Sequence, residues 1–315
     1  MPGRPAEGAA AAAVPKAGRA GGVVMALASA ACFSTLGLFA KLAYSEGFAI
    51  PQILAWRFTV AALALWTVTL ATGRAGRPWR EYRRTLLLGL FGFSPQAGLY
   101  FVTVSILDPG LTGLLLYLYP AFVVLLSAVF LRKMPRATQL GAVVLSLAGC
   151  ALTLWTTGHY PAFGYFMGVV VALAYAAYLV AGERVLAGTD SVFATANVMS
   201  AAAVLYWAIT LATGTLKVPA TPVATAGILG MALFGTVLPI TLLFGAMRRI
   251  GAADTSLVST VEPLITIVLS AILIGERLTP LQMAGGALIL AAVFILNARR
   301  PKPGISAPPA RNESV

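Results

Sequence analysis

Long apolar stretches separated by short polar segments make up most of this chain. Within each stretch the apolar residues are continuous and do not alternate with polar ones, which is typical of helices rather than of membrane-barrel strands. A helix needs about 20 mostly apolar residues to cross a bilayer. The pattern therefore predicts ten transmembrane helices, at approximately 22–44, 50–71, 85–106, 110–131, 137–157, 162–181, 192–212, 222–244, 253–274 and 279–297.

The hydrophobic pattern repeats after 143 positions. Residues 110–154 and 253–297 are identical at 10 of 45 positions, whereas composition would give roughly one identity in ten. The informative matches are Thr112/Thr255, Pro120/Pro263, Ser127/Ser270 and Gln139/Gln282. Because five helices per half is an odd number, the second half must enter the membrane upside down. We therefore expect an all-α polytopic membrane protein of two inverted five-helix repeats, 22–157 and 162–297, between flexible tails at 1–21 and 298–315.

Composition and charge agree with this placement. Hydrophobic residues make up 59% of the chain and charged residues only 10%, which is too little polar surface for a water-soluble globule of 315 residues. The net charge of +12 does not indicate nucleic acid, because 18 of the 22 Lys and Arg residues fall in segments that share one side of the membrane. We expect a monomer in a bacterial inner (plasma) membrane, with both termini cytoplasmic and its basic residues against lipid.

Four prolines lie in the middle of predicted spans. Pro95, Pro120, Pro239 and Pro263 each remove a backbone donor and are expected to bend their helix. They either mark hinges in moving, cavity-lining helices or are static kinks that suit packing. By contrast the spans 137–157 and 279–297 are rich in glycine and alanine, which is typical of a closely packed scaffold.

A polar stripe follows one face of the predicted span 253–274. Its members recur every three or four residues, at Thr255, Ser259, Glu262, Thr266 and Ser270. Glu262 is the carboxylate placed near the bilayer centre, where an ionised group needs a partner or water. It could bind a substrate amino group, carry a coupling proton, or be a structural partner of Arg57. Arg57 could equally bind a substrate carboxylate or pair with Glu46.

Polar aromatic side chains occupy midspan positions elsewhere. In the first half Tyr119 stands where the second half has Glu262, so spacing predicts that the two face each other across the pseudo-twofold axis. Shared helix faces hold two further pairs, Gln96 with Tyr100 and Tyr175 with Tyr178. Such groups could line a substrate cavity, or they could simply pack between helices with their polar ends bonded to backbone.

No enzymatic constellation occurs. Cys32 and Cys150 are isolated, and neither a metal-ligand set, a nucleophile with its base, nor a phosphate-binding glycine motif is present. The sequence therefore predicts a transporter without cofactor or metal, driven by a gradient of its substrate or of protons.

Several motifs resemble those of the drug/metabolite transporter superfamily, specifically its EamA-type ten-helix members. The matching residues are Pro51 with Arg57, Pro120, Glu262-Pro263 and Gly275-Glu276, within a resemblance that covers about residues 23–297. Among these transporters the chain looks most like the YddG-type amino-acid exporters. It departs from the family pattern in its first half, where Tyr119 replaces a Glu before proline and Arg132-Lys133 replaces Gly-Glu.

The resemblance implies export of amino acids, aromatic and other neutral ones, from a midplane cavity between the repeats by alternating access. Two alternatives remain. A multidrug or cationic-metabolite exporter would also use aromatic walls and Glu262. A nucleotide-sugar or organophosphate carrier would need several cations in the cavity, and Arg57 is the single candidate.

Overall fold

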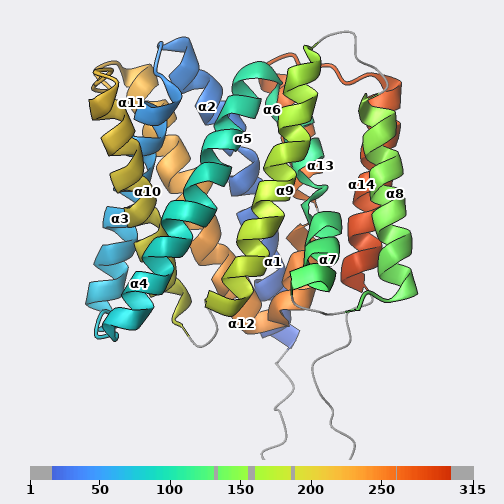
Figure 1. The fold of residues 1–315 in the computed structure, drawn as a ribbon, viewed down its shortest axis with the longest axis horizontal. Coiled ribbons are helices and arrows are strands. Elements are labelled where there is room, and N and C mark those ends of the chain that lie inside the picture. The colour runs from blue at the N-terminus through green and yellow to red at the C-terminus, as the bar shows by residue number, and fades with distance from the viewer. Residues whose placement is uncertain (1–15, 131–133, 155–159, 186–188, 260, 299–315) are drawn as a thin grey trace, which may run out of the picture.

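The computed structural model describes residues 16–130, 134–154, 160–185, 189–259 and 261–298. Every regular element in these ranges is a helix, and no strand occurs in them, which confirms the predicted all-α class. The helices stand side by side with their axes roughly parallel (Figure 1). Of the predicted tails, residues 1–15 and 299–315 lie outside the described residues, whereas residues 16–21 and residue 298 are helical.

The helices fall into two successive groups. The first comprises α1 (Lys16–Ser34), α2 (Leu36–Ser45), α3 (Ile50–Ala71), α4 (Trp79–Leu88), the π-helix η1 (Gly89–Phe93), α5 (Ser94–Ile106), α6 (Pro109–Leu116), α7 (Tyr119–Phe130) and α8 (Ala137–Leu154). The second comprises α9 (Ala162–Val185), α10 (Ser191–Ala212), α11 (Pro222–Ala232), the π-helix η2 (Leu233–Val237), α12 (Leu238–Ser259), α13 (Glu262–Leu273) and α14 (Pro280–Ala298).

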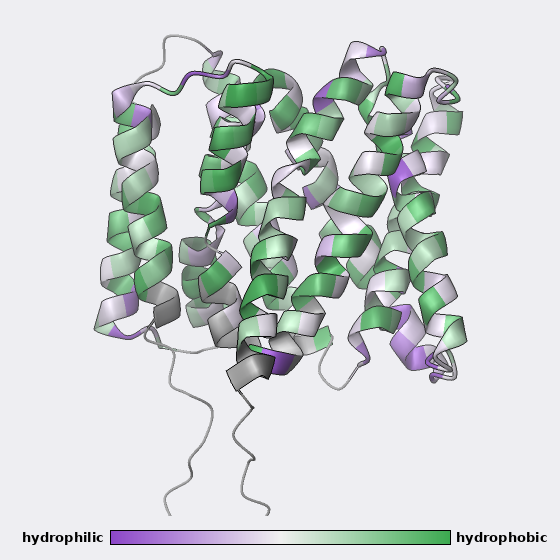
Figure 2. Cartoon of the chain, turned by 180° about the vertical axis from the view of Figure 1, so that it is seen from behind, coloured by the Kyte–Doolittle hydropathy of each residue, from purple (hydrophilic) through white to green (hydrophobic). Residues whose placement is uncertain are grey.

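The helices have the length and composition of membrane spans. Within the described ranges, 7 helical stretches of 21–28 residues are long and apolar enough to cross a bilayer, and 3 shorter apolar helices accompany them. Hydrophobic residues dominate along the helices, and the most hydrophilic ones gather mainly towards the two ends (Figure 2). The protein is therefore a polytopic membrane protein.

Each of the four midspan prolines is the second residue of a helix. Pro95 and Pro239 follow the π-helices η1 and η2, whereas Pro120 and Pro263 follow short turns. Because the first N–H groups of a helix have no intrahelical acceptor, proline at the start of α7 or α13 interrupts no hydrogen bond. Pro120 and Pro263 therefore start new helical segments, whereas Pro95 and Pro239 lie inside the continuous helical stretches Trp79–Ile106 and Pro222–Leu243, directly after the π-helices.

The predicted spans 22–44 and 110–131 are divided at Thr35 and at 117–118, and two further differences concern the second group of helices. The stretch 245–252, expected to be a loop, is helical, and α12 continues through it to Ser259. The expected span 253–274 is divided, because α13 starts only at Glu262 after the turn residue Val261. The segment 245–252 lacks proline and contains helix-favouring Ala, Met and Arg, so the hydrophobicity dip at Arg248-Arg249 does not end the helix.

The largest packing contacts join the two groups. Helix α3 packs on α10, α8 on α14 and α1 on α12, while α5 packs on α9 and α6 on α13. Helices α8 and α14 approach closely, since a Cβ atom at Gly149 would lie 2.6 Å from the carbonyl oxygen of Gly285. The core and the centre of the molecule are thus built from both groups.

Candidate functional site

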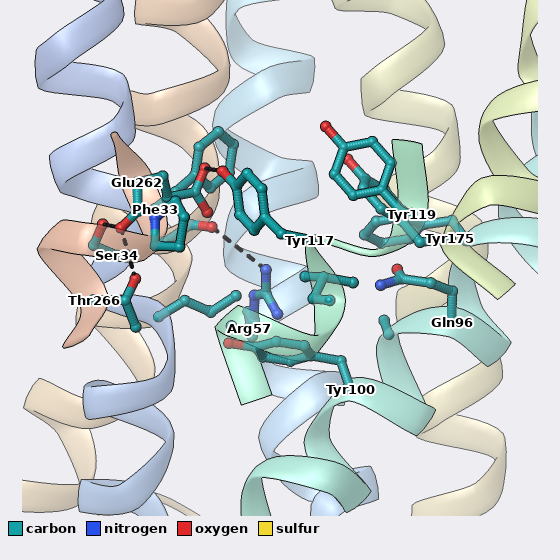
Figure 3. Close-up of a pocket in the computed structure, with 17 residues that line it drawn as sticks. Phe33, Ser34, Arg57, Gln96, Tyr100, Tyr117, Tyr119, Tyr175, Glu262 and Thr266 are labelled. Atoms are coloured by element: carbon teal, nitrogen blue, oxygen red, sulfur yellow. Dashed lines mark hydrogen bonds between the residues drawn. The ribbon is translucent and has the colours of Figure 1, made fainter. Parts of the chain in front are cut away.

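A cavity of about 180 Å³ lies where the interrupted helices meet. Its walls come from both groups of helices, chiefly α1, α3, α5, α6, α9 and α13. Figure 3 shows Glu262, Ser34 and Thr266 at one side, Gln96, Tyr119 and Tyr175 at the other, and Arg57 with Tyr100 between them. The remaining lining residues are Phe33, Leu36, Phe93, Ala97, Gly113, Leu116, Tyr117, Gly235 and Pro263.

Glu262 reaches the cavity because it is the first residue of α13. Its Oε2 accepts a hydrogen bond of 3.1 Å from the hydroxyl of Tyr117, and its backbone carbonyl accepts bonds from Ser34 and Thr266. No other hydrogen bond to the carboxylate occurs in the part of the chain that the structure describes. One carboxylate oxygen is therefore available to a ligand.

Arg57 enters the cavity from α3, with its side chain 5% exposed. Its Nε donates to the hydroxyl of Thr236 at 3.0 Å and its Nη2 to the carbonyl of Gly235 at 3.4 Å. Its guanidinium carbon lies 5.0 Å from the ring centre of Phe58 and 5.5 Å from that of Phe101. Among the described side chains, no carboxylate lies within ion-pair distance of it. The charge is buried and has no counter-ion among the described side chains, an arrangement that is costly unless a ligand uses it.

The π-helix η2 supplies both hydrogen-bond acceptors of Arg57. The Thr236 hydroxyl donates back to the carbonyl of Met231, five residues earlier, as the wider π-turn permits. The equivalent bond in η1 runs from Ser94 to Gly89. π-Turns inside α-helices are frequent at functional sites.

Tyrosine rings form the opposite wall. Tyr119 lies edge-on to Tyr175, with ring centres 4.8 Å apart, and to Tyr117 at 5.9 Å. Tyr175 in turn stacks on Tyr178 at 6.2 Å. Gln96 and Tyr100 face the cavity from α5. Such a wall can bury an apolar or aromatic group and orient polar ones.

The structure brings together most of the residues that the sequence singled out. Arg57, Gln96, Tyr100, Tyr119, Tyr175 and Glu262 share the cavity, and of the four prolines Pro263 lines it. Ser259 does not line it, and its buried hydroxyl has no hydrogen-bond partner. Tyr178 lies behind Tyr175 and lines a different groove.

The predicted partners of the charged groups are not observed. Arg57 pairs with neither Glu262 nor Glu46, and the Glu46 carboxylate instead accepts a hydrogen bond from Thr221. The hydroxyl of Tyr117, for which the sequence predicted no role, donates a hydrogen bond to the Glu262 carboxylate.

Sequence reasoning did not place Tyr117 or Ser34 in the site, and it assigned Thr266 to the polar stripe without counting it among the cavity residues. A continuous helix would turn Tyr117 about 200° away from Tyr119, at about 100° per residue, so the two were not expected to share a cavity. The turn at residues 117–118 removes that restriction. The sequence signal for this turn was Pro120, because proline is common in the first turn of a helix.

A second polar cluster ties the helices together at the end of α6 remote from the cavity. Glu276 accepts 2.9 Å hydrogen bonds from the backbone N–H groups of Gly110 and Leu111. Asp108 forms an ion pair with Lys41 at 3.0 Å and accepts a 2.5 Å bond from the hydroxyl of Tyr160. Burial raises the pKa of Glu276, and the two N–H donors oppose that rise. Burial and the Asp108 contact raise the pKa of Tyr160.

No cluster of three or more His, Cys, Asp or Glu side chains suited to a metal occurs among the described residues. Arg132 and Lys133, where the first half departs from the family pattern, lie outside them.

Comparison with known proteins places the chain among transporters. The EamA-like transporter family matches it twice, over residues 20–155 and 162–298. The uncharacterized transporter YcbK of Bacillus subtilis is 27% identical over 297 residues, covering 90% of this chain and 95% of the relative. A "probable terminal-alkyne amino-acid exporter" of Streptantibioticus cattleyicolor is 26% identical over 259 residues, covering 81% of this chain and 86% of that protein.

A solved crystal structure of a protein superposes with a TM-score of 0.63 at 19% sequence identity, covering 88% of this chain and 96% of the other. At this identity the likeness shows the shared fold.

Proposed function

Because this chain belongs to the EamA-like transporter family, we propose that it is a secondary transporter that exports amino acids, aromatic and other neutral ones, across the bacterial inner membrane. The observation that carries this proposal is a buried cation and a carboxylate in one cavity. Arg57 and Glu262 both line it without pairing with each other.

An amino acid carries both complementary charges. Its carboxylate can accept two parallel hydrogen bonds from a guanidinium such as that of Arg57. Its ammonium group can donate to the unoccupied carboxylate oxygen of Glu262. Binding a zwitterion would compensate the buried charge of Arg57 and satisfy Glu262 at once. Neither a purely anionic nor a purely cationic substrate would do both.

The size and lining of the cavity support a small substrate. A volume of about 180 Å³ is well below the about 300–1,000 Å³ typical of pockets for drug-sized molecules. It is similar to an apolar cavity of about 150 Å³ that admits benzene. The rings of Tyr119 and Tyr175 would contact an aromatic or aliphatic side chain. The relative described as an amino-acid exporter has the same class of substrate.

We further propose that the two family repeats are inverted and that rocking them exposes the cavity alternately to either side. Support comes from the antiparallel contact of α6 with α13, since Gly110 lies at Glu276 and Tyr117 at Glu262. Both ends of the described chain emerge at the same end of the bundle (Figure 1). The basic residues favour that end as the cytoplasmic one.

The alternatives fit the cavity less well. A cationic metabolite or drug would meet the uncompensated charge of Arg57 inside the same cavity. A nucleotide sugar would bring at least two phosphate charges to one cationic side chain, because Arg57 is the single Lys or Arg among the lining residues.

Counterflow in proteoliposomes tests the proposal. Vesicles loaded with one amino acid should accumulate labelled phenylalanine or leucine, and a panel of nucleobases, nucleotide sugars and quaternary amines should not compete. Competition by quaternary amines without competition by amino acids would replace the proposal with the cationic exporter.

Matched analogues locate each charge contact. Phenethylamine lacks the carboxylate of phenylalanine and phenylpropionate lacks its amine. Both should therefore compete only weakly with phenylalanine for transport by the wild-type protein. The substitution Arg57→Lys should lower the apparent affinity for phenylalanine about ten-fold and leave that for phenethylamine unchanged, because a point charge replaces a bidentate donor. An equal loss for both compounds would assign Arg57 a structural role.

A further inference from the structure

A second groove of about 610 Å³ lies on the lipid-facing surface between the two family repeats. One wall is the face of α4, η1 and α5 that presents Leu87, Phe91 and Pro95, at intervals of four residues. The other wall is the face of α9 that presents Ala174, Ala177 and Ala181. The small alanine side chains leave the space that makes the surface concave.

The groove has the length of one half of a bilayer. It extends from residue 84 to 95 on one wall and from 174 to 185 on the other. Eleven residues at a rise of about 1.5 Å per residue give about 16 Å. The hydrocarbon core of a bilayer is about 30 Å thick, so one leaflet contributes about 15 Å. A lipid acyl chain aligned with the helices would therefore match the groove from end to end.

Charge marks one end of the groove. Arg84 lines it at the end where α4 begins and α9 ends, and it is exposed. No described carboxylate pairs with Arg84, whereas Arg74 pairs with Asp190 at 3.5 Å. Arg80 and Arg83 follow the same short helix, against a single acidic residue, Glu81. The local excess of positive charge favours a negatively charged headgroup over a zwitterionic one.

We propose that this groove binds an anionic glycerophospholipid, with one acyl chain lying between the wall formed by α4, η1 and α5 and the wall formed by α9, and with the headgroup phosphate held by Arg84. The apolar walls have no other partner within the described chain, and guanidinium groups bind phosphate oxygens in bidentate fashion. The lipid comes from the leaflet on the arginine-rich side of the molecule.

The floor of the groove is the back of the cavity wall. Tyr178 lines the groove and stacks on Tyr175, which lines the cavity. Phe93, also at the cavity, has its ring centre 5.6 Å from that of Tyr178. The bound acyl chain supports these rings from behind, so its loss loosens the tyrosine wall.

Native mass spectrometry of the full-length protein tests the site. Delipidated protein in mild detergent is titrated with phosphatidylglycerol or with phosphatidylcholine. We expect one phosphatidylglycerol to be retained about ten-fold more tightly than phosphatidylcholine, because the choline ammonium of phosphatidylcholine offsets the charge of its phosphate beside the arginines. Replacing Arg84→Gln should abolish this preference. Its matched control is Arg80→Gln, which removes the same charge from the same helix outside the groove.

A second pair of variants tests the acyl chain. Replacing Ala177→Phe fills the groove and should abolish retention of both lipids, whereas Ala287→Phe adds the same ring to an exposed position of α14 and should change nothing. A phosphatidylglycerol with a diazirine in its acyl chain should label α9 and the wall formed by α4, η1 and α5.

Equal effects of each variant and its control, or labelling spread evenly over all helices, would show ordinary surrounding lipid and overturn the proposal. If Arg84→Gln fails to fold, Ala177→Phe and the labelling decide. The measurements need no transport substrate, so a failure of amino-acid export would leave them unaffected.

Discussion

Two carboxylates at opposite ends of the α13 segment differ in the groups that donate hydrogen bonds to them. The carboxylate of Glu276, just beyond α13, accepts a hydrogen bond at each oxygen from the backbone N–H groups at the start of α6. Glu262, at the start of α13, gives one oxygen to a tyrosine hydroxyl and faces the cavity with the other. Both lie in the second stretch that the EamA-like transporter family matches, yet Glu276 joins the two matched stretches and Glu262 lines the cavity.

The difference follows from the kind of donor. Backbone N–H groups at a helix start must be satisfied in every conformation that keeps the helix, and a carboxylate there also meets the positive end of the helix dipole. The bond of Glu276 is therefore part of the architecture. A tyrosine hydroxyl can rotate away, so the bond of Tyr117 to Glu262 can be exchanged for a substrate.

The largest expected effect is the loss of transport on replacing Glu262→Gln, an isosteric change that removes the charge. A lost charged hydrogen bond of about 1.5–3 kcal/mol lowers counterflow of a neutral amino acid at low concentration by about 10- to 100-fold. The thermal midpoint of the purified protein should stay close to that of the wild type. A lowered midpoint with unchanged counterflow per folded molecule would instead assign Glu262 a structural role like that of Glu276.

Replacing Glu276→Gln should have the opposite signature. The amide points donor hydrogens at the N–H groups of Gly110 or Leu111, so the free energy of unfolding falls by about 1.5–3 kcal/mol. Denaturation in detergent measures this loss. The half-saturating substrate concentration of the folded fraction should not change, and a large change in it would connect Glu276 to the substrate.

A smaller effect is expected from Tyr117→Phe, which keeps the ring and removes the hydroxyl that orients Glu262. A hydrogen bond from a neutral hydroxyl to a carboxylate at the partly open cavity contributes about 1 kcal/mol. Its loss should lower the substrate affinity about five-fold. Isothermal titration with phenylalanine measures it. Tyr160→Phe, at the remote cluster with Asp108, serves as the matched control and should leave the affinity unchanged.

The smallest effect belongs to the ion pair of Lys41 with Asp108, both partly exposed. Exposed pairs contribute about 0–1 kcal/mol, so Lys41→Met should lower the unfolding free energy by no more than that. Combining Lys41→Met with Asp108→Asn in a double-mutant cycle isolates the pair. A coupling energy above that range would show that this ion pair, like Glu276, contributes substantially to holding the two repeats together.

Particular residues show how far the sequence could predict the site. Arg57, Tyr100 and Glu262 could be singled out because charged and polar groups in an apolar span need a reason to be there. Tyr117 could not, since a helix assumed to be continuous turns it to another face. Tyr178 shares a face with Tyr175 on α9, but its neighbours on η1 and α5 place it in the groove.

The sequence alone predicts that the chain forms membrane-spanning helices, that half of it is repeated and that charged groups lie in the apolar spans, since hydrophobicity and composition are local properties of the chain. Which of those charged groups have no ionic partner among the described residues depends on the folded structure. Whether Arg57 meets Glu262 or the carbonyl and hydroxyl of η2 depends on where α3, η2 and α13 cross, and packing between distant segments sets those crossings.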